Sequence, residues 1–179
     1  DDTIVDANQT FQRLINAIQT AGGPLYAYRQ INPVDDQDGG EPGGNIRVGF
    51  LYRTDRGLTF VDRPGGTSTN ATTAVWGATG LELNYSPGRI APTNPAFLDS
   101  RKPLAGEFIF NNRKLIVVVN HFNSKSGDDP LFGFVQPPVL YSEVQRLAQA
   151  EVVNSFVDSI LALDADARVL VIGDFNDFQ

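Results

Sequence analysis

With 179 residues, the chain is long enough for one domain and too short for two of ordinary size. A hydrophobic fraction of 41% and a charged fraction of 20% are typical of a globular protein and exclude a disordered acidic tail. The net charge of −7 argues against a broad basic surface that holds nucleic acid, but it is compatible with a small local phosphate site.

The first half of the chain predicts one helix, three strands and a long irregular segment. Apolar residues at helical spacing predict a helix over residues 6–21, which Gly22-Gly23-Pro24 ends. Residues 62–100 are rich in Gly, Pro, Thr and Asn, and we expect them to form a long irregular insertion. Alternating and aromatic-rich runs predict strands over residues 25–31, 46–52 and 58–61.

The second half predicts three more strands and a long helix. Strands over residues 104–110 and 115–120 are joined by the turn-like pair Asn111-Asn112, and a third strand covers residues 168–172. The last two strands are apolar on both faces, so we expect both to be covered from both sides. A helix is predicted from about Val139 to Leu163, since Pro137-Pro138 suits a helix start. The residues expected to face inward are Leu140, Val144, Leu147, Phe156, Val157, Ile160 and Leu161.

This order of elements predicts an α/β or α+β fold with layered sheets and helices outside them. No apolar run is long enough to span a membrane. The chain starts at Asp1 without a leader, and residues 173–179 directly follow a predicted core strand. Both features predict a segment of a larger protein rather than an unprocessed small one.

Polar residues follow two of the predicted core strands directly. His121 follows the strand that ends at Asn120, and Asp174 and Asn176 follow the strand that ends at Ile172. If the two strands are parallel neighbours, their carboxyl ends place these side chains at one rim of the sheet, where ligands of layered folds commonly bind. In extended chain Asp174 and Asn176 would point to the same side, with Phe175 turned toward the core.

The residue types at this rim indicate chemistry with hard oxygen ligands. The chain has no Cys, so cysteine nucleophiles and thiolate metal sites are excluded, and its single His makes zinc a poor candidate. Carboxylate and amide oxygens suit Mg²⁺, with Mn²⁺ and Ca²⁺ as alternatives. Such an ion can neutralise a phosphodiester and assist a water nucleophile, while an imidazolium stabilises charge on a nonbridging oxygen.

Each of these residues also has a purely structural interpretation. Gly-Asp-x-Asn after a strand is often only a turn, and a histidine at a strand end can be an ordinary surface residue. Lys125 can add positive charge near the rim or simply be solvated, and Arg146 can do so or form a structural salt bridge. A serine hydrolase is poorly supported, because the chain has no G-x-S-x-G motif.

Three motifs, in their order along the chain, resemble the endonuclease/exonuclease/phosphatase superfamily, the metal-dependent phosphodiesterases that include type I deoxyribonucleases. They are Asn120–Lys125 (NHFNSK), Arg146–Ala150 (RLAQA) and Val169–Asp177 (VLVIGDFND). Val48–Arg53 and Arg101–Leu104 are similar to two further family elements. Within the superfamily, the chain looks most like large secreted bacterial nucleases.

The resemblance implies a fold, roles for residues and a setting. The fold is a two-sheet β-sandwich with helices on both faces, incomplete in this chain. His121 would stabilise the phosphate in the transition state, Asp174 would orient or deprotonate water and bind metal, and Asn176 would position phosphate or water and help to bind metal. The implied substrate contacts are Asn120, Lys125, Arg146 and Arg101. The protein would be extracellular or at the cell surface of a bacterium.

The chain also departs from the family pattern. The family begins with a strand that ends in a metal-binding Glu and closes with an Asp-His pair, and no residues of this chain match them. We therefore expect the 179 residues alone to hydrolyse phosphodiesters too slowly to be useful, since losing even one preorganised group costs about 10²–10³ in rate. Missing strands would leave sheet edges open, which predicts edge-strand association.

Three functions remain open from the sequence. The first is metal-dependent hydrolysis of DNA or RNA, and the second is hydrolysis of a lipid or sugar phosphodiester by the same site. The third is a binding domain that retains the fold without the reaction. The segments 62–100 and 126–137 would set substrate preference, and neither has a pattern that identifies it.

Overall fold

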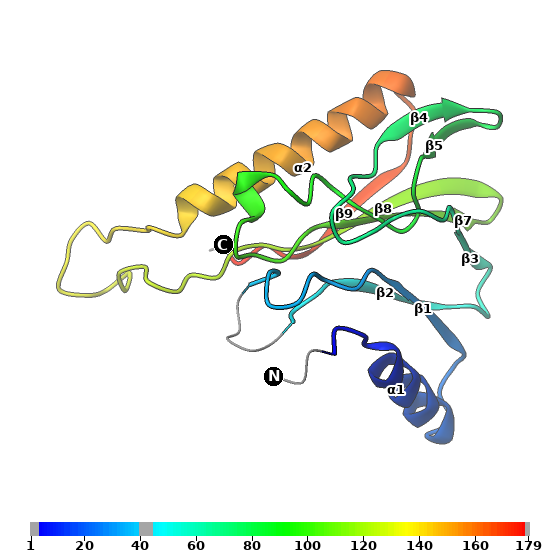
Figure 1. Cartoon of the computed structure of the whole chain (residues 1–179), viewed down its shortest axis with the longest axis horizontal. Coiled ribbons are helices and arrows are strands. Elements are labelled where there is room, and N and C mark those ends of the chain that lie inside the picture. Colours follow the sequence, from blue (N-terminus) through cyan, green and yellow to red (C-terminus); the bar gives the residue numbers. More distant parts are fainter. Residues whose placement is uncertain (1–3, 40–44, 178–179) are drawn as a thin grey trace.

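The computed structural model describes residues 4–39 and 45–177. A central sheet has the strand order β3-β7-β8-β9, and β6 pairs with β7 beyond the end of β3 (Figure 1). The elements in chain order are α1 (Asn8–Thr20), β1 (Tyr26–Gln30), β2 (Gly49–Arg53), β3 (Leu58–Val61), β4 (Ala74–Gly77), β5 (Gly80–Leu83), β6 (Gly88–Arg89), the 3-10 helix η1 (Pro95–Phe97), β7 (Leu104–Phe110), β8 (Arg113–His121), α2 (Glu143–Leu163) and β9 (Val169–Asp174).

The centre of the sheet is built from β7, β8 and β9. A tight turn joins β7 to the antiparallel β8, and its residues Asn111 and Asn112 both have positive φ, a conformation that asparagine tolerates well. The chain then crosses over through α2 and returns as β9, which runs parallel to β8. The parallel pairing brings the carboxyl ends of β8 and β9 together at one end of the sheet.

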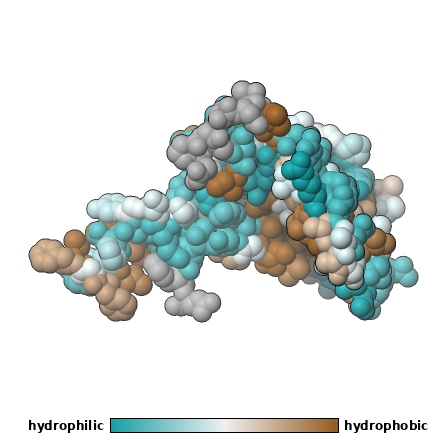
Figure 2. Space-filling view, turned by 90° about the horizontal axis from the view of Figure 1, so that it is seen from below, coloured by the Kyte–Doolittle hydropathy of each residue, from teal (hydrophilic) through white to brown (hydrophobic). Residues whose placement is uncertain are grey.

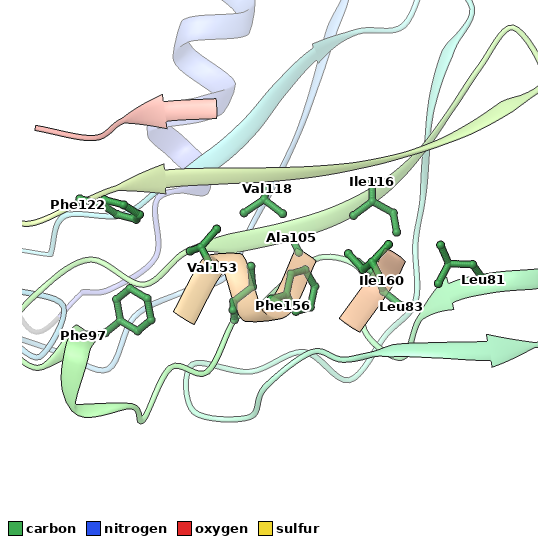
Figure 3. Packing of buried hydrophobic residues seen from close by; sticks show 11 residues of the cluster. Leu81, Leu83, Phe97, Ala105, Ile116, Val118, Phe122, Val153, Phe156 and Ile160 are labelled. Carbon is green, nitrogen blue, oxygen red and sulfur yellow. The ribbon is translucent and has the colours of Figure 1, made fainter. Parts of the chain in front are cut away.

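One face of the central sheet packs against α2. Alternate residues of β8, Ile116 and Val118, point to this face and meet Val153, Phe156 and Ile160 of the helix (Figure 3). The β4–β5 hairpin covers the same face near the end of α2, and Leu81 and Leu83 join the cluster.

The opposite face packs against the two-stranded β1–β2 sheet. Phe50 and Tyr52 of β2 meet Phe60, Phe108 and other side chains of the central sheet in an aromatic cluster with ring centroids 4.9–5.9 Å apart. The outer side of β1–β2 is covered by α1, whose Phe11 stacks on Tyr28 at 4.7 Å. Figure 1 shows the resulting order of layers, from α1 through the two sheets to α2.

This architecture confirms the predicted fold class, an α+β sandwich of two sheets with helices on both outer faces. Both helices and all six predicted strands are present within a few residues of their expected bounds. No helix in the described part of the chain is long and apolar enough to cross a membrane.

Three details of the predicted elements are wrong. The segment 62–100 is not irregular throughout, because it contains β4, β5, β6 and η1 and contributes Ile90 and Phe97 to the core. The long helix begins at Glu143 rather than near Val139. The strand β9 is not covered from both sides, since it pairs only with β8 among the described strands and its residues from Leu170 onward are exposed.

The inward face predicted for the long helix is also only partly right. Phe156 and Ile160 are buried as expected, whereas 75% of Val144 and 61% of Leu147 remain exposed. These two residues lie in the first turns of α2, which face an open groove instead of the core. Helical periodicity identified an apolar face, but it could not show where along the helix that face is covered.

Candidate functional site

The carboxyl ends of β8 and β9 bring the predicted catalytic residues together. In the parallel register His121 lies opposite Asp174, and Asn120 lies opposite Gly173. His121 and Asp174 are therefore neighbours on one face of the sheet, with imidazole Nε2 4.0 Å from the Asp174 Oδ2. The expectation that these two strands are parallel neighbours with a shared rim is confirmed.

A glycine permits this close approach of the two strand ends. Gly173 has a φ of +137°, and a Cβ at this position would lie 2.0 Å from the Asn120 carbonyl oxygen. Any other residue would therefore push β9 away from β8 at the point where the site begins.

The residues after β9 form a turn instead of the extended segment that was expected. The backbone N–H of Asn176 donates to the Asp174 Oδ1 at 2.9 Å, and Asn176 has a positive φ. Its side-chain amide donates to the Phe122 carbonyl at 3.0 Å. Phe175 is 38% exposed and not fully turned into the core, although its ring packs edge-on against Phe122. The turn thus uses one carboxylate oxygen of Asp174 as a hydrogen-bond acceptor. The Asn176 side chain attaches the turn to Phe122, the residue that follows β8.

Arg101 supplies a buried positive charge near His121 and Asp174. Its guanidinium donates to the Phe122 carbonyl, and only 3% of the residue is exposed. Its Nε has no hydrogen-bond partner among the described residues. Such burial makes direct contact with a large substrate difficult, so the charge would act mainly through its electric field.

The electrostatic environment keeps His121 neutral at pH 7. Burial lowers the pKa of the imidazole below its ordinary value, and the nearby Arg101 charge lowers this pKa further, while Asp174 opposes both effects. Burial also lowers the pKa of Arg101, against the opposing effect of Asp174. The lowered pKa favours the neutral ring over the imidazolium, and the N–H of a neutral ring can also donate to an anion.

Asn120 presents a hydrogen-bonding group that the protein does not satisfy. Its side-chain NH₂ donates to the Ile172 carbonyl at 3.1 Å, across the β8–β9 pair. Its Oδ1 is buried without a partner in the described structure. An orphaned buried acceptor at this position is consistent with a missing donor or cation.

The other two predicted substrate contacts lie at the edge of the site. Lys125 donates from Nζ to the Asp177 carbonyl at 3.3 Å, on the exposed side of the turn. Arg146 is buried on α2, bonds to Ser142 and forms an ion pair with Asp128 at 3.7 Å. In the described structure no hydrogen bond or ion pair joins Arg146 to the His121–Asp174 pair.

A groove of about 480 Å³ adjoins the site along the first turns of α2. Phe122 and Phe175, which directly follow β8 and β9, pack edge-on against each other and line it. Its lining is mostly apolar and consists of Phe122, Glu143, Val144, Arg146, Leu147, Ala150, Phe175 and Asp177.

The donor set fits a hard divalent cation that keeps most of its ligands as water or substrate. Asp174 is exposed and offers Oδ2, and the amide oxygen of Asn176 is a further hard ligand. No group of three or more His, Asp or Glu side chains in the described part of the chain could hold a metal. These residues would therefore bind Mg²⁺ weakly without a phosphate, as expected of an ion that needs only one or two carboxylates.

Sequence reasoning included Gln149 in the Arg146–Ala150 motif but gave it no role, and it did not single out Ser100. Ser100 and Gln149 are both fully buried, and Gln149 Nε2 donates one hydrogen bond to the Ser100 Oγ. The available signal for Gln149 was a glutamine among apolar neighbours on a long helix, which indicates a polar group that must find partners in the core.

A comparison with known protein families shows which family shares this sequence. The sequence model of the Endonuclease/Exonuclease/phosphatase family matches residues 84–178, which include β7, β8, α2 and β9. The chain belongs to this family. Searches of curated proteins and of solved structures give no significant match. The family comprises hydrolytic enzymes that act on phosphodiesters or phosphate monoesters, typically with a divalent metal.

Proposed function

We propose that this protein is a divalent-metal-dependent phosphodiesterase, most similar in role to a secreted bacterial nuclease that acts on DNA or RNA. The proposal is carried by one observation, the placement of His121 opposite Asp174 at the carboxyl ends of two parallel strands. The matching family supports hydrolysis of phosphate esters, and the likeness of the strand-end motifs to those of nucleases supports nucleic acid as the substrate.

We assign complementary tasks to the residues at the strand ends. Water attacks phosphorus, a P–O bond forms, and the bond to the leaving oxygen breaks. The Asp174 Oδ2 is free to accept a hydrogen bond from that water and orient it, because Oδ1 is held by the turn. The neutral imidazole of His121 donates to a nonbridging oxygen, and the buried charge of Arg101 favours the anion.

Mg²⁺, bound by Asp174 with Asn176, would supply charge neutralisation at the phosphate. The side chains around it supply orientation and hydrogen bonds. Asn176 is held by Phe122 and by Asp174, so it can position phosphate without a large loss of entropy on binding.

A lipid phosphodiester is the second candidate, and one observation favours it. Phe132 and Phe134 are almost fully exposed in the loop between β8 and α2, which starts beside the site. Figure 2 shows the hydrophobic end of this projecting loop at the left. Such a surface suits an apolar carrier of the phosphate better than a nucleic-acid backbone.

The substrate class is tested by hydrolysis with the complete gene product that contains these residues. In Mg²⁺ buffer, we expect cleavage of DNA or RNA and loss of at least about 10²-fold in kcat for Asp174→Asn. Asp166→Asn, an exposed aspartate before the start of β9, is the matched control and should retain activity. Cleavage of phospholipid vesicles but not nucleic acid would support the second candidate, and no cleavage of either would support a binding domain.

Metal binding is tested separately in residues 1–179, because it does not require turnover. The chain has one histidine, so its imidazole NMR signals are unambiguous. Mn²⁺ bound at Asp174 should broaden these signals strongly, and Asp174→Asn should abolish the broadening while Asp166→Asn should not. Equal broadening in all three proteins would exclude Asp174 as a ligand.

We also propose that residues 1–179 alone hydrolyse phosphodiesters far more slowly than the complete gene product. The reason is that residues 1–179 contain one histidine, whereas the resemblance implies that hydrolysis requires a second. Equal turnover of both proteins in the same assay would show that the residues assigned above are sufficient.

A further inference from the structure

Gln149 of α2 connects three segments that build the proposed site. The residue is fully buried, and its side-chain amide makes three hydrogen bonds. Oε1 accepts from the backbone N–H of Asn123 at 2.8 Å, and Nε2 donates to the Ala96 carbonyl and to the Ser100 Oγ, both at 2.9 Å. The amide therefore uses both of its donor hydrogens and one of its two acceptor positions.

The segments that Gln149 joins carry the charged groups of the site. Ser100 immediately precedes Arg101, and Asn123 comes two residues after His121. Between them, the Phe122 carbonyl accepts from both Arg101 and Asn176. The Phe122 N–H completes the connection by donating to the Asp174 carbonyl at 2.9 Å.

We propose that Gln149 is a positioning residue that fixes Arg101 and the end of β8 relative to one another, and thereby the anion-binding geometry at His121. This inference rests on the proposed function, since it concerns the same site. Gln149 does not touch a substrate itself. It acts through the backbone segments on either side of the direct hydrogen bond from Arg101 to the Phe122 carbonyl.

The alternative is that Gln149 only attaches α2 to the rest of the domain. A neighbouring residue distinguishes the two roles. Gln145, one helical turn earlier, donates to the carbonyls of Ala96 and Leu98 at 3.2 and 2.9 Å. It thus attaches α2 to the same 96–98 segment, but it does not reach Ser100 or the end of β8. Gln145→Ala is therefore a matched control for attachment without positioning.

The test is a titration of residues 1–179 with inorganic phosphate, monitored at fixed pH by the NMR signals of His121. Gln149→Met keeps the length of the side chain and removes all three hydrogen bonds. We expect its dissociation constant for phosphate to rise about tenfold, as is usual when a residue that orients a ligand-binding group is lost. Gln145→Ala should stay within about twofold of the unsubstituted protein, and measurement well below both melting temperatures removes any effect of stability.

Two direct signals accompany the titration. The Asn123 amide should exchange with solvent faster in Gln149→Met, and the Arg101 Nε resonance should shift because its segment has moved. Neither should change in Gln145→Ala. Unchanged phosphate affinity, or unchanged Asn123 and Arg101 signals, in a folded Gln149→Met protein would overturn the proposal.

A second variant keeps the proposal testable if Gln149→Met does not fold. Ser100→Ala removes one partner of Nε2 and leaves the other two hydrogen bonds, so phosphate affinity should fall to an intermediate value with a shifted Arg101 Nε signal. No change in either would contradict the positioning role. If the unsubstituted protein shows no saturable phosphate shift, the proposed function fails, whereas the Asn123 and Arg101 signals still decide the role of Gln149.

Discussion

The protonation state of His121 depends in part on the nearby buried charge of Arg101. Burial and Arg101 both lower the pKa of the imidazole, and Asp174 only partly offsets them. A lowered pKa means that the folded protein binds a proton less readily than the unfolded chain. His121 therefore disfavours folding increasingly as the pH falls below the ordinary histidine pKa of about 6.5, and has no such effect at higher pH.

Replacing Arg101 tests this account directly. Arg101→Gln removes the charge, so the pKa of His121 should rise toward about 6.5, and the loss of stability on acidification should become smaller. An NMR titration of the single histidine measures the first effect, and urea unfolding at several pH values measures the second. Arg113→Gln, at the opposite end of β8, should leave the pKa of His121 unchanged. An unchanged pKa in Arg101→Gln would show that burial alone sets it.

Gly173 offers a second prediction for a single residue. Gly173→Ala adds a methyl group that would lie 2.0 Å from the Asn120 carbonyl oxygen, so it should lower the free energy of unfolding by about 3 kcal/mol or more. Gly127→Ala is the control for positive φ alone, because Gly127 has a φ of +89° and no atom within 4 Å of the added Cβ. Gly127→Ala should lower the free energy of unfolding, measured in urea, by about 1–2 kcal/mol. Equal losses would mean that β9 can move away from β8 without further penalty.

At the scale of elements, α2 has two functionally different halves. Its second half seals the core through Val153, Phe156 and Ile160, as Figure 3 shows. Its first half places Val144 and Leu147 in the groove beside the site. The same helix thus stabilises the sheet and lines the groove beside Phe122 and Phe175.

Alanine substitutions along α2 should show this division. Phe156→Ala should lower the free energy of unfolding by about 3–5 kcal/mol, because it opens a cavity in the core. Leu147→Ala should change it by less than about 1 kcal/mol, since most of Leu147 is already exposed. Urea denaturation of both variants measures the difference. A large loss for Leu147→Ala would indicate that the groove is closed in solution.

Much of the fold was predictable because its main elements have strong local patterns. The hairpin of β7 and β8 combines two apolar runs with an Asn-Asn turn, and α1 is ended by two glycines and a proline. The strands β4, β5 and β6 were missed, since strands of two to four residues carry too little periodicity to detect. Their positions depend on partners distant in the sequence.

The candidate site was predictable only where strand order determines it. Two parallel neighbours necessarily align their carboxyl ends, which places His121 beside Asp174. The turn at Asn176 and the burial of Arg101 and Arg146 arise from tertiary hydrogen bonds and ion pairs. Residue type and spacing contain no information on those partners.

At the scale of the whole molecule, buried ion pairs attach loops to the layered core. Arg89 of β6 and Asp38 are both almost fully buried and pair at 2.6 Å, and Lys102 lies 3.4 Å from the same carboxylate. Because breaking one partner would leave a charge in the core, this cluster fixes the loop that contains Asp38 against the segment before β7. Because Lys102 directly follows Arg101, the same cluster also anchors the segment that carries Arg101.

Residues 126–142, between β8 and α2, form a loop that projects from the layers of the molecule (Figure 1). Its Phe132 and Phe134 side chains are 99% and 105% exposed, and no charged residue occurs from Pro130 to Ser142. Chymotrypsin cleaves after exposed aromatic residues in loops, so its first cut should fall after Phe132 or Phe134. Intact-mass spectrometry of a brief digest locates that cut.

The two fragments should remain associated after this cut. The C-terminal one contains α2 and β9, which stay attached through the core and through the β8–β9 pairing, whose register extends over six residue pairs. They should therefore elute together in size-exclusion chromatography and separate only in denaturant. A double variant, Phe132→Ser with Phe134→Ser, should resist the first cut without losing stability. A first cut within residues 62–100 would instead show that this segment, despite its buried Ile90 and Phe97, opens more readily than the loop.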